Sequence, residues 1–337
     1  MSYSVALIGA GYFSRFHIEA WEALPGTTLA GIADLDLERA GATGHPAFTD
    51  AGEMLEATRP DIIDIAAPPG AHADLIRLAL SHRPSAIICQ KPFCTSRDEA
   101  RTLAEEAEAE GVPLVVHENF RFQPWYRAMR DAIEDESLGR LHRLTFTLRT
   151  GDGQGPTAYL DRQPYFQTMP RLLIHETGVH WVDTFRFLLG RPDAVDADLQ
   201  RMNPVIKGED AGRFTFRYAD GLRATFDGNR CLDAGAENPR LTFGTALLEG
   251  EEASLQLSTD GSLHRRSFGA RHETAVLSPH TGRGFAGDCV TALQAHVVAA
   301  LDGTGPWENL ALDYLEVLEI EEAIYRANET GAVQELD

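Results

Sequence analysis

Residues 5–14 of the chain read Val5-Ala6-Leu7-Ile8-Gly9-Ala10-Gly11-Tyr12-Phe13-Ser14. A short apolar strand runs straight into a glycine-rich turn, and a helical pattern follows the turn. The first glycine permits a tight turn, and the second lets a pyrophosphate approach the backbone at the N-terminus of the helix. Ser14 stands where the usual pattern has a third glycine, and it is small enough for close packing. We therefore predict a dinucleotide-binding turn; a structural turn without cofactor is the alternative.

An acidic residue follows at the spacing that such a turn requires. Asp34 lies 20 residues past Ser14, at the end of the next predicted strand. A carboxylate there would bind the 2′-hydroxyl of a ribose and repel a 2′-phosphate, which favours NAD over NADP. Arg39 lies nearby and could accommodate a 2′-phosphate, so NADP stays possible.

Further apolar runs continue the same pattern through the first third of the chain. They are Leu29–Ala33, Ile62–Ala66, Ala86–Cys89 and Leu114–Val116, with Asp64 as the one charged interruption. Such runs are typical of parallel strands buried on both faces. Ser96 and Glu99 form a capping-box pattern at the start of a helix that continues through Glu110. The sequence thus predicts an α/β Rossmann domain with a parallel sheet over residues 1–121.

The pattern changes after Arg121 to alternating polar and apolar residues. Asp220-Gly221 and Asp260-Gly261 are turn signals between such stretches, as in antiparallel hairpins. Helices are expected over 125–136, 288–301 and 310–328. Residues 122–337 are therefore predicted to form an α+β domain for substrate binding and oligomerisation, with a large, open, mainly antiparallel sheet. Because so few helices cannot cover both faces of that sheet, we expect a homodimer or homotetramer.

Composition narrows the class of protein. The net charge of -21 over 337 residues disfavours nucleic-acid and membrane partners. No apolar run is long enough to span a bilayer, and no signal peptide is apparent, so we expect a cytoplasmic protein. Of the 30 basic residues, only Lys91 and Lys207 are lysines. A retained lysine indicates a need for a compact amine, although chance could also explain it.

Several motifs taken together resemble one known family. They are Arg15-Phe16-His17 after the glycine turn, Ala67-Pro68-Pro69-Gly70-Ala71-His72, Gln90-Lys91-Pro92, Asn119-Phe120-Arg121-Phe122, and Glu176-Thr177-Gly178-Val179-His180 with Asp183. The chain resembles, over nearly its whole length, the Gfo/Idh/MocA oxidoreductases, named for glucose–fructose oxidoreductase and inositol dehydrogenase. Two positions depart from the family pattern: Gln90 replaces a glutamate and Glu176 an aspartate.

The resemblance implies an NAD-dependent enzyme and assigns its site residues. Lys91 and His180 would be catalytic, since an imidazole can accept a hydroxyl proton and an ammonium can activate the hydroxyl. The cofactor would be bound by Gly9, Gly11, Tyr12, Phe13, Asp34, Pro68, His72, Gln90, Lys91 and Asn119. The substrate would be bound by Lys91, Asn119, Arg121, Tyr159, Arg162, Gln163, Glu176 and His180, several of them from the long polar loop 150–170.

Structural roles remain open for each of these residues. His180 could be an ordinary helix imidazole, Lys91 a surface amine and Glu176 a structural partner. His175-Glu176 with His180 suggests zinc, but the two histidines are five residues apart rather than four, so no metal is predicted.

A narrower resemblance concerns the substrate. Residues 117–126 and 159–167 are similar to the D-apiose dehydrogenase branch, which implies oxidation of an aldose at its anomeric carbon to a lactone or aldonate. An inositol or polyol dehydrogenase, a redox-neutral glycoside-cleaving enzyme and a non-catalytic NAD-binding sensor are the alternatives.

Overall fold

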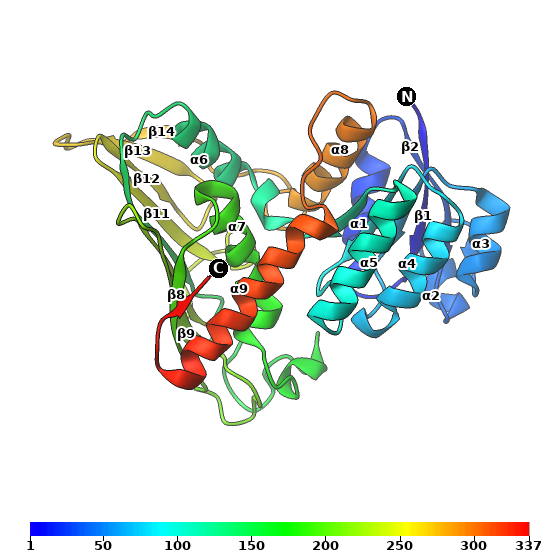
Figure 1. The fold of residues 1–337 in the computed structure, drawn as a ribbon, viewed down its shortest axis with the longest axis horizontal. Helices are drawn as coiled ribbons and strands as arrows, with labels where there is room; N and C mark the ends of the chain where they lie inside the picture. Colours follow the sequence, from blue (N-terminus) through cyan, green and yellow to red (C-terminus); the bar gives the residue numbers. More distant parts are fainter. Residues whose placement is uncertain (337) are drawn as a thin grey trace. The chain divides into compact units, whose positions relative to one another are not determined.

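The computed structural model describes residues 1–336, and the chain in it forms two compact units (Figure 1). The first unit comprises Met1–Asn119 and Cys289–Leu318. The second comprises Phe120–Asp288 and residues 319–336. The sequence analysis placed one boundary after residue 121 and kept 122–337 together. In the structure, however, residues 289–318 group with the first unit.

A six-stranded sheet forms the centre of the first unit. Its strands are β1 (Tyr3–Ile8), β2 (Thr27–Ala33), β3 (Ala47–Phe48), β4 (Ile62–Ile65), β5 (Ala86–Gln90) and β6 (Leu114–His117). Their order is β3-β2-β1-β4-β5-β6, and every neighbouring pair is parallel. The strand order reverses beside β1, which is where dinucleotides bind in this topology. The predicted Rossmann architecture is confirmed.

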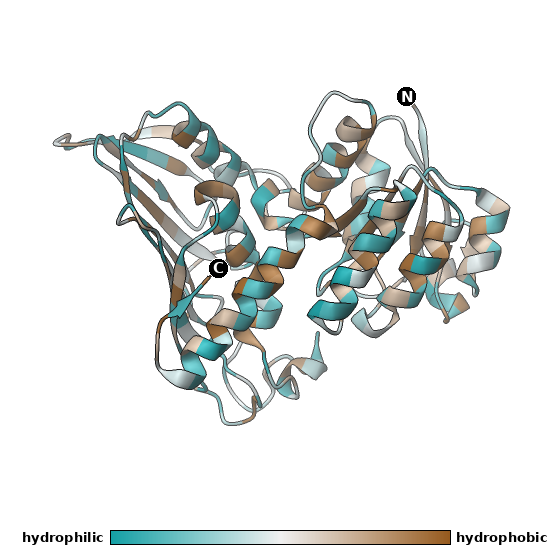
Figure 2. Ribbon diagram, in the orientation of Figure 1, coloured by the Kyte–Doolittle hydropathy of each residue, from teal (hydrophilic) through white to brown (hydrophobic). Residues whose placement is uncertain are grey.

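Helices connect these strands. They are α1 (Ser14–Ala23), α2 (Leu37–Gly41), α3 (Ala51–Thr58), α4 (His72–Ser81) and α5 (Arg97–Glu110). As predicted, the hydroxyl of Ser96 caps α5 by accepting a hydrogen bond from Glu99 N–H. Figure 2 shows that the helices carry both hydrophilic and hydrophobic residues, as amphipathic helices beside a sheet should.

The returning segment completes the first unit. Helix α8 (Cys289–Leu301) packs against α1, and the backbone N–H of Val116 in β6 donates to the Asn309 carbonyl. Helix α9 (Ala311–Thr330) follows, and the boundary between the units falls inside it, after Leu318.

A nine-stranded sheet forms the centre of the second unit. Its strands are β7 (Leu141–Leu148), β8 (Ala194–Gln200), β9 (Ala211–Arg217), β10 (Arg223–Asn229), β11 (Gly244–Gly250), β12 (Ala253–Leu257), β13 (Leu263–Ser267), β14 (Thr274–Leu277) and β15 (Gln334–Glu335). The order is β14-β13-β12-β11-β7-β10-β9-β8-β15. Within this sheet, as described over residues 1–336, only the β7–β10 pair is parallel. The predicted open, mainly antiparallel sheet is therefore confirmed.

One face of this sheet is covered by helices and carries the core. Helices α6 (Pro124–Glu134) and α7 (Val179–Leu189), with the second part of α9, lie on one side of the sheet in Figure 1. The ring of Trp181 in α7 stacks on Phe146 of β7, with centroids 4.0 Å apart. The alternation seen in the sequence follows from this arrangement, because every second side chain of a strand faces α7.

The opposite face carries a row of half-buried side chains across four strands. Leu247 of β11 pairs with Thr145 of β7, Thr145 with Thr225 of β10, and Thr225 with Thr215 of β9. We call these four residues the outer row. Among residues 1–336 no helix is both long and apolar enough to cross a membrane.

Candidate active site

The glycine turn after β1 has the geometry that the sequence predicts. Gly9 has a φ of +105°, and a Cβ there would lie 2.6 Å from the carbonyl oxygen of Ala66. Only glycine fits, because the turn passes closely over the end of β4. A Cβ on Gly11, in contrast, would meet nothing within 4 Å among residues 1–336. The space beside Gly11 is therefore open for a ligand at the N-terminus of α1.

The carboxylate of Asp34 lies beside this turn. Its Oδ2 accepts a hydrogen bond from Ala10 N–H at 2.7 Å, and its Oδ1 accepts one from Asp36 N–H at 2.9 Å. The guanidinium of Arg39 pairs instead with Asp36, at 3.2 Å. Asp34 thus faces the turn as a carboxylate, and the nearby arginine is held by another acid. These features fit NAD: the pyrophosphate could lie at the open glycine turn and the N-terminus of α1, and the Asp34 carboxylate could bind the ribose.

The other predicted cofactor residues of the first unit lie at or just after the carboxyl ends of β1, β4, β5 and β6. Tyr12 is exposed and lies under the guanidinium of Arg15, while Phe13 meets the ring of His117 edge-on. Pro68 is exposed and precedes the short 3₁₀ helix η1 (Pro69–Ala71).

His72 joins two of these loops from inside the protein. It is fully buried, with Nδ1 2.9 Å from the carbonyl oxygen of Phe93 and Nε2 2.8 Å from that of Ala67. Its ring therefore ties the loop after β4 to the loop that contains Lys91.

Lys91 follows β5 directly, and its backbone N–H donates to Oε1 of Gln90 at 2.7 Å. The amide nitrogen of Gln90 lies 3.1 Å from Nε2 of His17, so both ends of this side chain contact the protein itself. Asn119 ends the first unit. It is 2% exposed, and its Nδ2 finds no hydrogen-bond partner within residues 1–336. A buried amide donor without a partner is a natural contact for a ligand oxygen.

His180 lies in the first turn of α7, in the second unit. Its ring is 7% exposed and stacks face to face on Phe120, with centroids 3.9 Å apart and planes inclined by 8°. The ring of Trp181 meets that of Phe120 edge-on. The plane of the imidazole is thus fixed by aromatic neighbours.

Arg121 forms an ion pair with Asp183, one turn after His180. Nε donates to Oδ2 at 2.8 Å, and Nη2 donates to Oδ1. Asp183 is buried, so this two-point pair anchors the segment after β6 to α7. The predicted substrate role of Arg121 stays a prediction beside this structural one.

The loop 150–170 is organised around a buried arginine that the sequence analysis did not identify. Arg230, which follows β10, is 4% exposed. Its Nε donates to Tyr159 Oη at 2.7 Å, Nη1 to Thr177 Oγ1 at 2.6 Å, and Nη2 to Asp152 Oδ2 at 2.9 Å. One guanidinium therefore holds the loop, and it also contacts the helical segment that carries Glu176.

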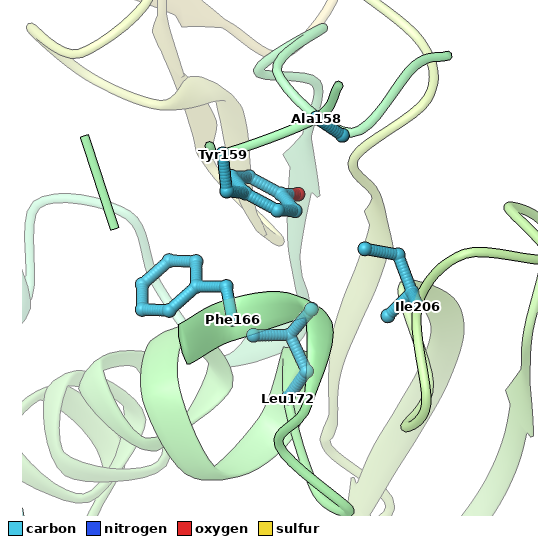
Figure 3. Packing of buried hydrophobic residues seen from close by; sticks show 5 residues of the cluster. All are labelled: Ala158, Tyr159, Phe166, Leu172 and Ile206. Carbon is cyan, nitrogen blue, oxygen red and sulfur yellow. The ribbon is translucent and has the colours of Figure 1, made fainter. Parts of the chain in front are cut away.

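Apolar contacts complete this anchor. Figure 3 shows the ring of Tyr159 in a cluster of buried residues with Ala158, Phe166, Leu172 and Ile206. Tyr159 is buried in this cluster, and its hydroxyl is bound to Arg230. The structure thus gives Tyr159 a role in holding the loop, while direct contact with substrate stays a prediction.

The predicted loop residues that follow Tyr159 are less buried. Arg162 donates to Asp152 Oδ2 at 3.0 Å, and the Gln163 amide donates to Tyr165 Oη at 3.0 Å. Burial alone would raise the pKa of Asp152, but the positive charge of Arg230 and the hydrogen bond from Thr150 outweigh it. The pKa of Asp152 is therefore lowered. Burial would lower the pKa of the Arg230 guanidinium, but the negative charge of Asp152 outweighs burial and raises it.

Glu176 lies in a π-helical turn, η4 (Leu173–Gly178), directly before α7. Such turns often occur at functional sites. The preceding residue, His175, pairs with Glu321 of α9 through Nδ1 at 2.7 Å. Within residues 1–336, no group of three or more His, Cys, Asp and Glu side chains is arranged to hold a metal ion.

Two contributions to the site escaped the sequence analysis. Neither Phe120 nor Arg230 is among the site residues that the sequence predicts. No local pattern identifies Arg230, because its partner Asp152 lies 78 residues away in the sequence. The sequence did contain a signal for the buried contacts of Gln90. Asp64, the charged residue of an otherwise apolar strand, is fully buried beside His17, which contacts Gln90.

Known proteins resemble the chain in both parts. Residues 3–118 match an oxidoreductase family with an NAD-binding Rossmann fold, and residues 126–255 match the GFO/IDH/MocA C-terminal domain. A D-apiose dehydrogenase from Paraburkholderia graminis is 33% identical, over 98% of this chain and 89% of its own length. An inositol 2-dehydrogenase from Rubrobacter xylanophilus is 26% identical, over 99% of this chain and 93% of its own.

A solved structure extends this similarity. The crystal structure of an oxidoreductase from Agrobacterium radiobacter, in complex with NAD⁺, L-tartaric acid and magnesium, superimposes with a TM-score of 0.88 at 26% identity. The similarity covers 99% of this chain and 98% of that one.

Proposed function

From the premise that this chain belongs to the Gfo/Idh/MocA family of NAD-binding oxidoreductases, we propose that it oxidises a sugar hydroxyl, at the anomeric carbon of an aldose such as D-apiose. The product would be a lactone or the aldonate formed from it. The observation that carries the sugar assignment is the 33% identity with a D-apiose dehydrogenase over nearly the whole chain.

The proposed chemistry separates a hydride from a proton. NAD, when bound, supplies the acceptor for the hydride. We assign His180 as the base that takes the hydroxyl proton, since its ring is held in one plane by Phe120. Lys91 would stabilise the developing alkoxide with its ammonium group.

The binding roles follow from the contacts of each residue. Gly9, Gly11 and Asp34 would hold the dinucleotide, and the unpartnered amide of Asn119 would donate to an oxygen of cofactor or substrate. Arg162, Gln163 and Glu176 would bind sugar hydroxyls. Arg230 and Tyr159 would act by holding the loop that carries them.

The protein as a whole is proposed to be a cytoplasmic homo-oligomer. The outer row on the sheet face opposite the helices favours the homo-oligomer.

A panel of sugars with NAD tests the function. The purified chain is mixed with NAD and, in turn, D-apiose, other aldopentoses, aldohexoses and myo-inositol, and NADH absorbance is followed. We expect the highest kcat/KM with D-apiose. A preference for myo-inositol would make the chain a polyol dehydrogenase. Tight NAD binding without net NADH from any substrate would contradict a dehydrogenase and favour a sensor or a redox-neutral enzyme.

A further inference from the structure

A fully buried polar cluster lies behind Lys91 in the first unit. Its centre is the pair His17 and Asp64, neither of which is exposed. His17 belongs to α1 and Asp64 to β4. Two ionisable groups away from water cost free energy unless hydrogen bonds satisfy them, so their partners define their protonation states.

Hydrogen bonds to the pair come from α1, β5 and α8, and Gln294 Nε2 of α8 lies 3.5 Å from Asp64 Oδ2. Asp64 Oδ1 has no hydrogen-bond partner within residues 1–336. His17 Nδ1 lies 2.8 Å from Asp64 Oδ2, and Trp21 Nε1–H donates to the same oxygen at 2.7 Å. Gln294 of α8 donates its amide to the His17 carbonyl at 3.3 Å. His17 Nε2 lies 3.1 Å from the amide nitrogen of Gln90.

The side-chain amide of Gln90 cannot be flipped to exchange its oxygen and nitrogen. Its Oε1 accepts from the backbone N–H of Lys91, which can only donate. Its nitrogen, a donor, must therefore face His17. A donor facing Nε2 requires an unprotonated nitrogen there, so the ring proton must be on Nδ1, where it is donated to Asp64. This arrangement alone gives Lys91 N–H, Gln90 and both ring nitrogens of His17 a matching partner.

We propose that His17 is a positioning residue for Lys91, and that the Gln90 amide holds it as a neutral imidazole protonated at Nδ1. The chain of hydrogen bonds runs from Asp64 through His17 and Gln90 to the backbone of Lys91. The groups that face His17 from the surrounding elements are Asp64 and the stacked ring of His117, with uncharged Phe13, Trp21, Gln90 and Gln294.

The glutamine has a consequence for charge. A glutamate at position 90 would accept from Lys91 N–H and also from His17, which would then need a proton on both ring nitrogens. The cluster would carry the same net charge of about one negative in either case. With glutamine, however, that charge is on Asp64, three hydrogen bonds away from the backbone of Lys91. With glutamate, one negative group would lie directly beside Lys91.

The role of His17 in turnover rests on the proposed function of Lys91, but its protonation state does not. Histidine-labelled protein is therefore examined first by long-range ¹H–¹⁵N NMR, with His17→Gln identifying the His17 signals. We expect wild-type His17 to show a protonated Nδ1 and a bare Nε2. In Gln90→Glu, we expect both nitrogens to be protonated. His72, whose ring nitrogens face two backbone carbonyls, is the internal control and should not change.

Either of two NMR results would overturn the proposal. One is a proton on Nε2 of wild-type His17. The other is an unchanged neutral ring in Gln90→Glu, which would show that residue 90 does not set the state of His17.

A double-mutant cycle then tests the link to Lys91. A glutamine at position 17 can accept at one end of its amide and donate at the other, as the neutral ring does, but it cannot donate from both ends as the doubly protonated ring does. We expect His17→Gln to lower the kcat of the wild type about threefold. In the Gln90→Glu background, the same substitution should lower kcat about thirtyfold relative to Gln90→Glu alone. The Kd for NAD should stay nearly constant in all variants. Equal costs in both backgrounds would refute the coupling. If instead Lys91→Met were fully active while the NMR results held, the catalytic proposal would fail and the protonation assignment would stand.

Discussion

The imidazole of His180 lies flat on the ring of Phe120, with the two centroids 3.9 Å apart. Phe120 is in turn flanked by Trp181, Phe243 and Phe285. Stacking resists rotation of the imidazole about its Cβ–Cγ bond, so the ring nitrogens stay in one plane. This is the arrangement that a positioned base requires.

The catalytic pair can be tested by two single variants. His180→Ala and Lys91→Met should each lower kcat by about a hundredfold to ten-thousandfold, since each removes a group that acts on the reacting hydroxyl. The double variant should be scarcely worse than either single one, because groups acting as a unit are not additive.

Matched controls separate catalysis from structure. His175→Ala removes another histidine of the same segment, and Lys207→Met removes the other lysine, which is exposed. Near-normal turnover in His180→Ala would make His180 structural. The base would then have to be sought in Lys91, Glu176 or Asp183.

Asp34 is predicted to determine the choice of cofactor. Asp34→Asn keeps an oxygen for the Ala10 N–H but removes the negative charge, so NAD should bind about tenfold more weakly and NADP more tightly. Asp36→Asn is the control, because Asp36 caps α2 and pairs with Arg39. Isothermal titration with both cofactors measures the effect. Equal affinities of the wild type for NAD and NADP would remove Asp34 from its assigned role.

The pair Asp152–Arg230 predicts a particular loss of stability in acid. Because the folded pKa of Asp152 lies below its ordinary value of 3.8, its contribution is fully present above that value. It is lost as the pH falls through the lower folded pKa. Asp152→Asn should therefore lower the free energy of unfolding by about 2 kcal/mol at pH 7 and flatten its decline below pH 4.

Urea denaturation at a series of pH values measures this effect. Asp161→Asn, which changes an exposed carboxylate of the same loop, should leave both the stability and its acid slope unchanged. An equal response of the two variants would show that the Arg230 anchor does not contribute to stability.

The outer row predicts the oligomeric state. Sedimentation should show a dimer or tetramer at micromolar concentration. Thr145→Arg, in the middle of the row, should shift it toward monomer because a charge would be buried in the interface. Thr102→Arg makes the same change on the exposed side of α5 and should have no effect. A monomeric wild type would end this proposal.

The sequence predicted the elements whose signals are local. The runs at Val5–Ile8 and Leu29–Ala33 became neighbouring parallel strands, and Asp220-Gly221 became a turn. The sequence could not reveal the return of residues 289–318 to the first unit, because no periodicity records which sheet a helix covers. Nor could it reveal the contacts of Arg230 or His17, which depend on distant segments meeting in the folded chain.

The return of residues 289–318 also affects how the protein is synthesised. Helix α8, which packs against α1, and Asn309, which bonds β6, emerge from the ribosome only after the whole stretch 120–288. The side of α1 that α8 covers therefore stays exposed to water until the strands of the larger sheet have been synthesised. Translation beyond residue 318 completes the first unit, so cutting the gene near codon 121 would yield a fragment that lacks part of its own core.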